Sequence, residues 1–230
     1  MLQPSTHQSE ARRLTDVLRA ASEHGETFQD RGTVEERADT LQLVLEGGVL
    51  RQRFFADGRR HTVAIYYRDD VINLMGFVER GRKNTDYLMA LKGAVIGYVP
   101  NATVAEIRAM APSGFDGVSF LIYRELGMAQ ERTVSLAQRT AVERMAHFFC
   151  ETLVRCSRPG SNDRLSRCTL HLSQELLATI LGLSSVHVNR TLQHLRRLKL
   201  PDIVHNQLIV DDFDRLAEVA EFDPAYLARI

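Results

Sequence analysis

Residues 173–195 read SQELLATILGLSSVHVNRTLQHL, and this stretch decides the fold of the C-terminal part of the chain. Leu177, Ala178 and Leu181 recur at the spacing of one helical face. Gly182 follows them, and glycine is the residue that most readily takes the left-handed backbone at a helix end. We therefore expect a short amphipathic helix that ends in a tight turn.

A second helix is expected directly after this turn. Ser184 has the hydroxyl that an N-cap position needs, and Val188, Leu192 and Leu195 recur behind it at helical spacing. The small Ala178, the turn glycine and Val188 have the spacing typical of a DNA-reading helix-turn-helix. An ordinary helical hairpin is the alternative that this stretch alone leaves open.

The composition is that of a globular protein with one large or two modest domains. The chain has 230 residues, 44% of them hydrophobic, and 29 basic residues balance 29 acidic ones. Because the net charge is zero, nucleic-acid binding must depend on local charge. The sequence has no apolar run long enough to span a membrane, and MLQPSTHQSEARR at its start lacks the apolar core of a signal peptide. We expect a cytoplasmic protein that does not bind membranes.

The spacing of the three cysteines matches no metal-binding or redox motif. Cys150, Cys156 and Cys168 form no C-x-x-C pair and have no histidine at metal-ligand spacing. The first two are expected on different faces of one helix. We expect structural or incidental cysteines and no metal site, and a redox role is the alternative.

In the N-terminal half, between Phe28 and Val99, the period of the apolar residues changes to two, which is typical of half-buried strands. The expected strands are residues 41–46, 49–55, 61–67, 86–91 and 94–99. Asp57-Gly58 separates two of them and is a strong hairpin signal. This spacing predicts an antiparallel β-roll or sandwich. A helix over residues 11–24 is expected before it, and a helix that opens at the capping box of residues 103–106 after it.

Residues 115–136 carry a heptad pattern, with apolar or small residues at alternating steps of four and three. This period is typical of a helix that pairs with a second helix. The seam consists of Phe115, Ser119, Ile122, Leu126, Ala129, Thr133 and Leu136. Phe120, Tyr123 and Met128 lie off the seam and could pack on the β-roll. We expect the axis of a homodimer, and the alternative is a helix docked only within its own subunit.

A hinge is expected where this seam ends. Thr140 and Glu143 form a second capping box, so a new helix must begin there. The long helix therefore breaks near residues 137–139. The hinge separates the β-roll and the dimer helix from the C-terminal part.

A β-hairpin wing is expected beyond the helix-turn-helix. Residues 203–210 contain two short apolar runs around His205-Asn206-Gln207, and asparagine tolerates the positive φ of such a turn. Asp211 or Asp212 could cap a last helix. A polar loop after Pro159-Gly160 leads into the helix-turn-helix.

These elements together resemble the bacterial Crp/Fnr transcription regulators, which are named for the cyclic-AMP receptor and the fumarate-nitrate-reduction regulator. The resemblance is carried by RTAVERMAHFFCETLVR (139–155), LSQELLATILGLSSVHVNRTLQHLRR (172–197) and FDPAYL (222–227). It extends over residues 25–230 and is most specific in the C-terminal part. It implies an α+β fold with a cyclic-nucleotide-binding-like β-roll sensor at 1–114, a dimerisation helix and hinge at 115–139, and a winged helix-turn-helix at 140–230.

The resemblance implies a homodimer that reads a palindromic promoter site in double-stranded DNA and contacts RNA polymerase. In this family the N-terminal part of the second helix, here residues 184–195, enters the major groove. The positions concerned are Ser184, Ser185, Val186, His187, Asn189 and Arg190. Ser184 could instead cap the helix, and a solvated helix face is the alternative for His187 and Asn189.

Two of these positions predict particular base contacts. Arg190 matches the family's base-contacting arginine and suits a bidentate contact with guanine. Val186 stands where relatives often have a glutamate, which favours contact with a thymine methyl group and puts the usual half-site in doubt. Arg196, Arg197 and Lys199 extend a basic edge suited to phosphate contacts.

The sensing site is where the chain departs from the family. Cyclic-nucleotide binders have a Gly-Glu pair and then an Arg-Ser pair. Those positions here hold Asn73-Leu74 and Asn84-Thr85, and Arg82 lies two residues early. We therefore expect an effector other than cyclic AMP, and its identity stays open.

No cofactor is expected. The family's iron–sulfur members carry an N-terminal cysteine cluster, and no cysteine precedes Cys150 here. Haem stays open only through an unassigned histidine such as His24 or His61.

The sequence also lacks the G-x-S-x-G, H-E-x-x-H, G-x-x-x-x-G-K and G-x-G-x-x-G motifs, so we do not expect an enzyme. The alternative function is an effector-binding or protein-interaction module of the same fold that has lost DNA binding, against which the intact 184–190 surface argues.

Overall fold

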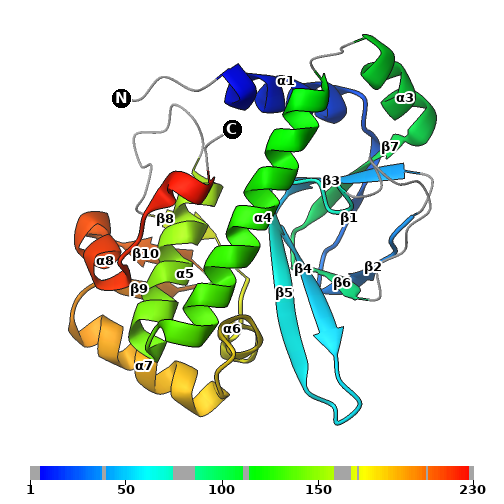
Figure 1. Ribbon diagram of the computed structural model, residues 1–230. Coiled ribbons are helices and arrows are strands. Elements are labelled where there is room, and N and C mark those ends of the chain that lie inside the picture. Colours follow the sequence, from blue (N-terminus) through cyan, green and yellow to red (C-terminus); the bar gives the residue numbers. More distant parts are fainter. Residues whose placement is uncertain are drawn as a thin grey trace. The chain divides into compact units, whose positions relative to one another are not determined.

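The computed structural model describes residues 6–37, 40–74, 86–110, 114–157, 167–169, 171–205 and 207–227 (Figure 1). The chain divides into two compact units. Unit 1 comprises residues 1–58, 63–127 and 228–230, and unit 2 comprises residues 59–62 and 128–227. The long helix α4 (Gly114–Gln138) contributes residues to both. In the described ranges, no helix combines the length and apolarity that a bilayer crossing requires.

Unit 1 is built on two antiparallel sheets, as the β-roll prediction requires. One has the strand order β1-β7-β3 and the other β2-β6-β4-β5. The strands are β1 (Glu23–Thr27), β2 (Gly32–Val34), β3 (Thr40–Glu46), β4 (Gly48–Phe54), β5 (Arg60–Tyr67), β6 (Tyr87–Ala90) and β7 (Val95–Pro100). The helices α1 (Thr6–Ala20) and α3 (Asn101–Met110) complete the unit with the first half of α4. The predicted α+β fold is thereby confirmed.

The apolar alternation of the strands becomes the core of unit 1. Leu41 and Leu43 of β3 lie opposite Val99 and Gly97 of β7, and both leucines are buried. They pack in one cluster with Val118 of α4. A second cluster lies around Val44 and Ile96. The strands therefore bury two apolar clusters, and the first half of α4 packs on the one that contains Leu41 and Leu43.

Several predicted boundaries in unit 1 were wrong. The first helix ends at Ala20 rather than near residue 24, and β1 follows it. The strands β1 and β2 were not predicted. The helix α3 begins at Asn101, two residues before the predicted capping box. The Asp57-Gly58 turn is present, with Gly58 at φ 82° and its N–H donating to the carbonyl of Phe55.

Unit 2 is organised around α5 (Ala141–Cys156), in which every residue from Met145 to Val154 is buried. Helix α5 packs against α6 (Gln174–Leu181), α7 (Ser185–Arg197) and α8 (Phe213–Ala220) (Figure 1). A small antiparallel sheet has the order β8-β10-β9. Its strands are β8 (Arg167–Thr169), β9 (Pro201–Val204) and β10 (Gln207–Val210), and η1 (Pro224–Leu227) follows α8.

The predicted wing is the hairpin of β9 and β10, in which Gln207 pairs with Val204 and Leu208 with Ile203. His205 takes the positive φ of the turn, at 49°, whereas the predicted turn residue Asn206 lies outside the described residues. The strand β8 was not predicted. Asp212 caps α8, since its side chain accepts from the N–H of Arg215. The loop at Pro159-Gly160 also lies outside the described residues.

A disulfide joins two elements of unit 2. Cys156, the last residue of α5, is bonded to Cys168 of β8, and their Cα atoms lie 6.1 Å apart. Cys150 is a buried free thiol, and burial raises its pKa to about 12. Sequence reasoning found no pairing, because a separation of 12 residues across two elements has no recognisable motif. The bond fastens one edge of the wing sheet to the central helix.

Candidate nucleic-acid interface

The helix-turn-helix is formed by α6, the turn at Gly182 and Leu183, and α7. Gly182 has φ 63° and ψ 36°, and its N–H donates to the carbonyl of Ala178. A Cβ at this position would lie 3.0 Å from Cδ2 of Leu136. Both the left-handed backbone and the close approach therefore require glycine.

Serine side chains begin both helices of the motif. Ser173 accepts from the N–H of Leu176, and Ser184 accepts from the N–H of His187 at 3.2 Å. Of the two roles left open for Ser184, the structure therefore shows the N-cap. The turn geometry between these caps fixes which side of α7 faces outward.

The outward side of α7 contains most of the residues predicted to read DNA. Val188, Leu192 and Leu195 are buried, whereas the exposed side chains are Ser185, Val186, His187, Asn189 and Arg190. Val186 is 63% exposed, which is unusual for a valine that serves only packing. Beside them lies an open groove of about 350 Å³, lined by Val142, Ser184, Val186, His187, Arg190, Thr191 and His194. The helix thus presents a mixed polar and apolar edge, as direct base readout needs.

The two predicted phosphate-binding arginines lie in different environments. Nε of Arg196 donates to a carboxylate oxygen of Asp202 of β9 at 2.6 Å, and Nη2 of Arg196 donates to the carbonyl of Ile203 at 3.2 Å. Arg196 therefore links α7 to strand β9 of the wing. Arg197 is exposed at the end of the same helix. A role of Arg196 in DNA contact stays a prediction, and the geometry favours Arg197 for it.

An amide pair joins the two helices of the motif at the surface. Nδ2 of Asn189 donates to Oε1 of Gln174 at 3.2 Å, and both side chains are exposed. Gln174 was not predicted as a site residue, since nothing in the spacing of the motif singles it out. The N-terminal turn of α7 contains no acidic residue, so the positive end of its helix dipole is uncompensated there.

The break between α4 and α5 has the predicted capping box. The side chain of Thr140 accepts from the N–H of Glu143, and the carboxylate of Glu143 accepts from the N–H of Thr140 at 2.8 Å. Helix α4 ends at Gln138 and α5 begins at Ala141. The two helices are therefore separate, as a hinge requires.

The expected dimer seam is largely solvent-exposed in the single chain. Leu126 is 53% exposed, and the side chains of Ser119, Ala129 and Thr133 are exposed as well. Ile122 packs partly buried against the core of unit 1, and Leu136 lies beside Gly182. The side chain of Phe115 lies outside the described residues.

Of the residues expected to pack on the β-roll, Phe120 packs against the core of unit 1 and Met128 is half-buried. Tyr123 was wrongly placed, since it is 66% exposed. It adds an aromatic side chain next to the exposed part of the seam. Over the described residues, the helix thus presents a stripe of apolar and small side chains to solvent.

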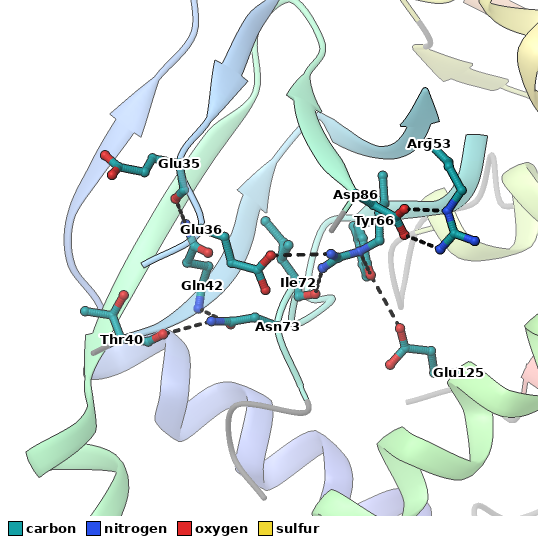
Figure 2. A network of polar contacts seen from close by, with 11 residues as sticks. Glu35, Glu36, Thr40, Gln42, Arg53, Tyr66, Ile72, Asn73, Asp86 and Glu125 are labelled. Carbon is teal, nitrogen blue, oxygen red and sulfur yellow. Dashed lines mark hydrogen bonds and ion pairs between the residues drawn. The ribbon is translucent and has the colours of Figure 1, made fainter. Parts of the chain in front are cut away.

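The structure describes two of the sensor positions named from the sequence, Asn73 and Leu74, and both make contacts within the fold of unit 1. Asn73 is buried: its Oδ1 accepts from the N–H of Gln42, and its Nδ2 donates to the carbonyl of Thr40 (Figure 2). Leu74 is buried in the core of unit 1. Asn84-Thr85 and Arg82 lie outside the described residues.

A second polar network in unit 1 was not predicted (Figure 2). Arg51 of β4 is 5% exposed and donates to the hydroxyl of Tyr66 at 3.0 Å and to the carbonyl of Ile72 at 2.8 Å. Tyr66 in turn donates to Glu125 of α4. Burial raises the pKa of Tyr66 to about 12 and also raises the pKa of Glu125. The network links strands of the roll to the first half of α4.

Ionisable groups are also buried around α5. His147 lies 3.2 Å from Glu131, and its ring stacks on Tyr226. Burial, and then the positive charge of Arg139, lower the pKa of His147. Glu151 accepts from Tyr226 and pairs with Arg155. These contacts tie η1 to the central helix of unit 2.

A metal centre was not expected from the sequence. Within the described ranges, no cluster of three or more histidine, cysteine or acidic side chains has the geometry of a metal site.

Comparison with known proteins agrees with this geometry. Residues 143–219, which extend from α5 to α8, match the family model of the Crp-like helix-turn-helix domain. The transcriptional activatory protein AadR of Rhodopseudomonas palustris is 26% identical over 198 residues, which cover 80% of this chain and 75% of that protein. The nitrogen fixation regulation protein FixK of Bradyrhizobium diazoefficiens is 28% identical over 187 residues, or 81% of this chain and 76% of the relative.

Solved structures show the same fold over most of the chain. The structure of FixK2 from Bradyrhizobium japonicum superposes with a TM-score of 0.70 at 21% identity and covers 85% of this chain and 96% of that one. A CRP-family transcriptional regulator from Thermus thermophilus superposes with a TM-score of 0.65 at 20% identity, over 86% of this chain and 97% of that one. The similarity therefore includes the β-roll, α4 and the winged domain.

Proposed function

This chain belongs to the Crp/Fnr family of transcription regulators, and we propose that it acts as a homodimer that reads a two-fold symmetric promoter site through α7. The observation that carries the proposal is the division of α7 into two faces. Val188, Leu192 and Leu195 are buried, whereas Val186 and Arg190 are exposed and line the groove, and Asn189 is exposed next to them along the helix. A helix that has lost DNA reading has no need of this exposed set.

The homodimer forms through the exposed stripe of α4. Pairing two copies there places their two recognition helices in successive major grooves, about 34–36 Å apart. The half-sites of the DNA are then arranged as a palindrome, because the two-fold axis of the protein coincides with that of the site. Domain boundaries at residues 114 and 139 follow from this arrangement of sensor, dimer helix and DNA-binding domain.

Each exposed residue of α7 has a distinct part in recognition. Arg190 reads guanine through two hydrogen bonds, and Val186 contacts a thymine methyl group. His187 and Ser185 flank them at the groove edge. The N-terminus of α7 and the basic edge at Arg197 bind phosphates and hold the register.

Regulation and cellular setting follow from the same family membership. We propose that the bound dimer contacts RNA polymerase in the cytoplasm, and that its effector differs from cyclic AMP. The buried amide of Asn73 and the buried side chain of Leu74 support the latter, since neither offers a carboxylate for a ribose hydroxyl.

The test is a selection of random duplexes with the purified protein, followed by a salt titration on the selected site. We expect a two-fold symmetric site, and an affinity that falls steeply between about 50 and 200 mM salt because bound counterions are released. Selection of no duplex either with or without an added metabolite extract, or an affinity independent of salt, would contradict DNA reading. Addition of a metabolite extract to a failed selection then tests whether an effector is required.

A further inference from the structure

A single arginine side chain joins three helices of unit 2. The guanidinium of Arg144, near the start of α5, donates four hydrogen bonds to main-chain carbonyls. Its partners are the carbonyls of Ser135 at 3.1 Å, Leu136 at 3.1 Å, Arg139 at 3.0 Å and Leu181 at 2.8 Å. The first two belong to the last turn of α4, the third to the residue just after it, and the fourth is the last residue of α6.

The carbonyls of Leu136 and Leu181 lie in the last turn of a helix, where carbonyl groups lack an intrahelical partner. The carbonyl of Ser135, in the same last turn of α4, also accepts from the N–H of Arg139 at 3.3 Å. These helix-end carbonyls also carry the negative end of each helix dipole, so a cation is favoured beside them. A guanidinium suits the task because its five N–H groups form a rigid planar fork. Burial lowers the pKa of Arg144 from its ordinary value, yet an arginine stays charged at neutral pH.

A second contact joins the same two helices. Cδ2 of Leu136, in the last turn of α4, lies 3.0 Å from the position that a Cβ on Gly182 would occupy. The turn of the helix-turn-helix therefore packs directly on the end of the dimer helix. Arg144 and this contact act together across the break at Thr140, where the backbone is no longer helical.

We infer that Arg144 is a positioning residue that fixes the helix-turn-helix against the end of α4 and thereby sets the half-site spacing that the homodimer reads. The inference rests on the proposed function, since spacing has a meaning only for a dimer on DNA. In the absence of these four bonds, only the contact of Leu136 with Gly182 and that of Glu131 with His147 remain of the contacts named here across the break. The relative angle of the two helices is then less restrained. Each recognition helix would then still read its half-site, but the pair would fit several spacings.

The experiment uses the full chain and duplexes that carry two copies of the selected half-site with every spacing represented. We compare the wild-type chain with Arg144→Gln, which retains polarity but loses the charge and the fork. The matched control is Arg155→Gln on the same helix, because Arg155 pairs with Glu151 within α5. Circular dichroism and sedimentation establish that each variant is folded and dimeric.

We expect the wild-type chain and Arg155→Gln to select one spacing. Arg144→Gln should select several spacings and bind the preferred one about tenfold more weakly, since the two sites are no longer held at the matching distance. Its affinity for a duplex with a single half-site should be unchanged. If Arg144→Gln does not fold, Arg144→Lys replaces it, because one ammonium group cannot reach carbonyls on both helices at once.

Other results overturn the inference. A variant that retains the single wild-type spacing at full affinity contradicts the positioning role of Arg144. Equal losses on single and paired half-sites show that Arg144 only stabilises the fold. Failure of the wild-type chain to select any paired site contradicts the proposed function itself, and this outcome is distinguishable because it does not depend on the variant.

Discussion

At the residue scale, the polar side chains of α7 have different surroundings. Ser184 caps the helix and Arg196 is bound to Asp202 and Ile203 of the wing. Arg190 is exposed beside the groove, where it can reach DNA. The polar residues of one helix therefore differ in what they can contribute, although their composition alone suggests one basic patch.

Arg190→Ala should weaken binding to the selected site by about 1–3 kcal/mol, because a bidentate contact with one guanine is lost. The loss should be confined to one base pair of each half-site, as measured by titration against duplexes substituted at every position. Arg197→Ala is the matched control, and it should weaken binding to all duplexes alike and reduce the salt dependence. Equal losses for Arg190→Ala on selected and random DNA would refute base reading.

His147 should make the stability of the chain depend on pH. Burial and the charge of Arg139 lower its pKa in the folded state, so the folded state favours the neutral ring. The free energy of unfolding should be constant above about pH 6.5, the ordinary histidine value, and should fall as the pH decreases below it. Denaturant unfolding at several pH values measures this, and His147→Gln should reduce the decrease. Stability that rises on acidification over this interval would contradict the assignment.

At the element scale, α4 combines two faces with different surroundings. Phe120 and Leu121 pack into the core of unit 1, whereas Leu126 and Tyr123 remain exposed. A helix of 25 residues with an exposed apolar stripe is typical of an association surface. The element therefore serves the fold on one side and, as we propose, the dimer on the other.

Leu126→Glu should convert the dimer to monomers, because it would place two like charges opposite each other in the helix seam. The substitution should not unfold the single chain, since Leu126 is 53% exposed. Sedimentation equilibrium measures the change. Gln138→Glu, at an exposed position beyond the seam, is the control that should remain dimeric. A dimeric Leu126→Glu chain would refute the seam.

At the same scale, the disulfide between Cys156 and Cys168 joins α5 to strand β8. Removing it by Cys156→Ser with Cys168→Ser should lower the free energy of unfolding by about 3 kcal/mol, since the bond joins residues separated by 12 positions. Denaturant unfolding should show the same loss when the wild-type chain is reduced, and the double variant should not respond to the reductant. Identical stability of wild-type and double-variant chains without reductant would contradict the bond.

At the scale of the whole molecule, α4 is the element that the two units share. Unit 1 holds the first half of α4 through Arg51, Tyr66 and Glu125. Unit 2 holds the end of the same helix through Arg144. One helix therefore contributes residues to both units.

Cyclic AMP should not change the DNA affinity of the chain. The fold uses the amide of Asn73 for its own main chain, and Leu74 is buried in the core. Titration of the selected duplex with and without the nucleotide should give equal dissociation constants, and calorimetry should detect no binding. An increase in affinity of tenfold, or about 1.4 kcal/mol, would refute this prediction.

The sequence by itself determined the elements whose signals are local. The caps at Ser184 and Thr140, the glycine at residue 182 and the period of the apolar residues are read from a few neighbouring residues, and they located α5, α6, α7 and the wing. The roles of the exposed residues on α7 stay predictions. The strand β1 (EHGET) was missed because it lacks apolar alternation and forms only by pairing with β7.

Only the tertiary structure decided the contacts between residues far apart along the chain. Three contacts depend on how separate elements pack: the Cys156–Cys168 disulfide, the hydrogen bond from Arg196 to Asp202 and the hydrogen bond from Arg144 to Leu181. The physical reason is that a helix end leaves carbonyls unpaired wherever it occurs, but which cation meets them depends on the packing of other helices. Local spacing therefore defined the DNA-reading motif, and long-range packing defined what holds it in place.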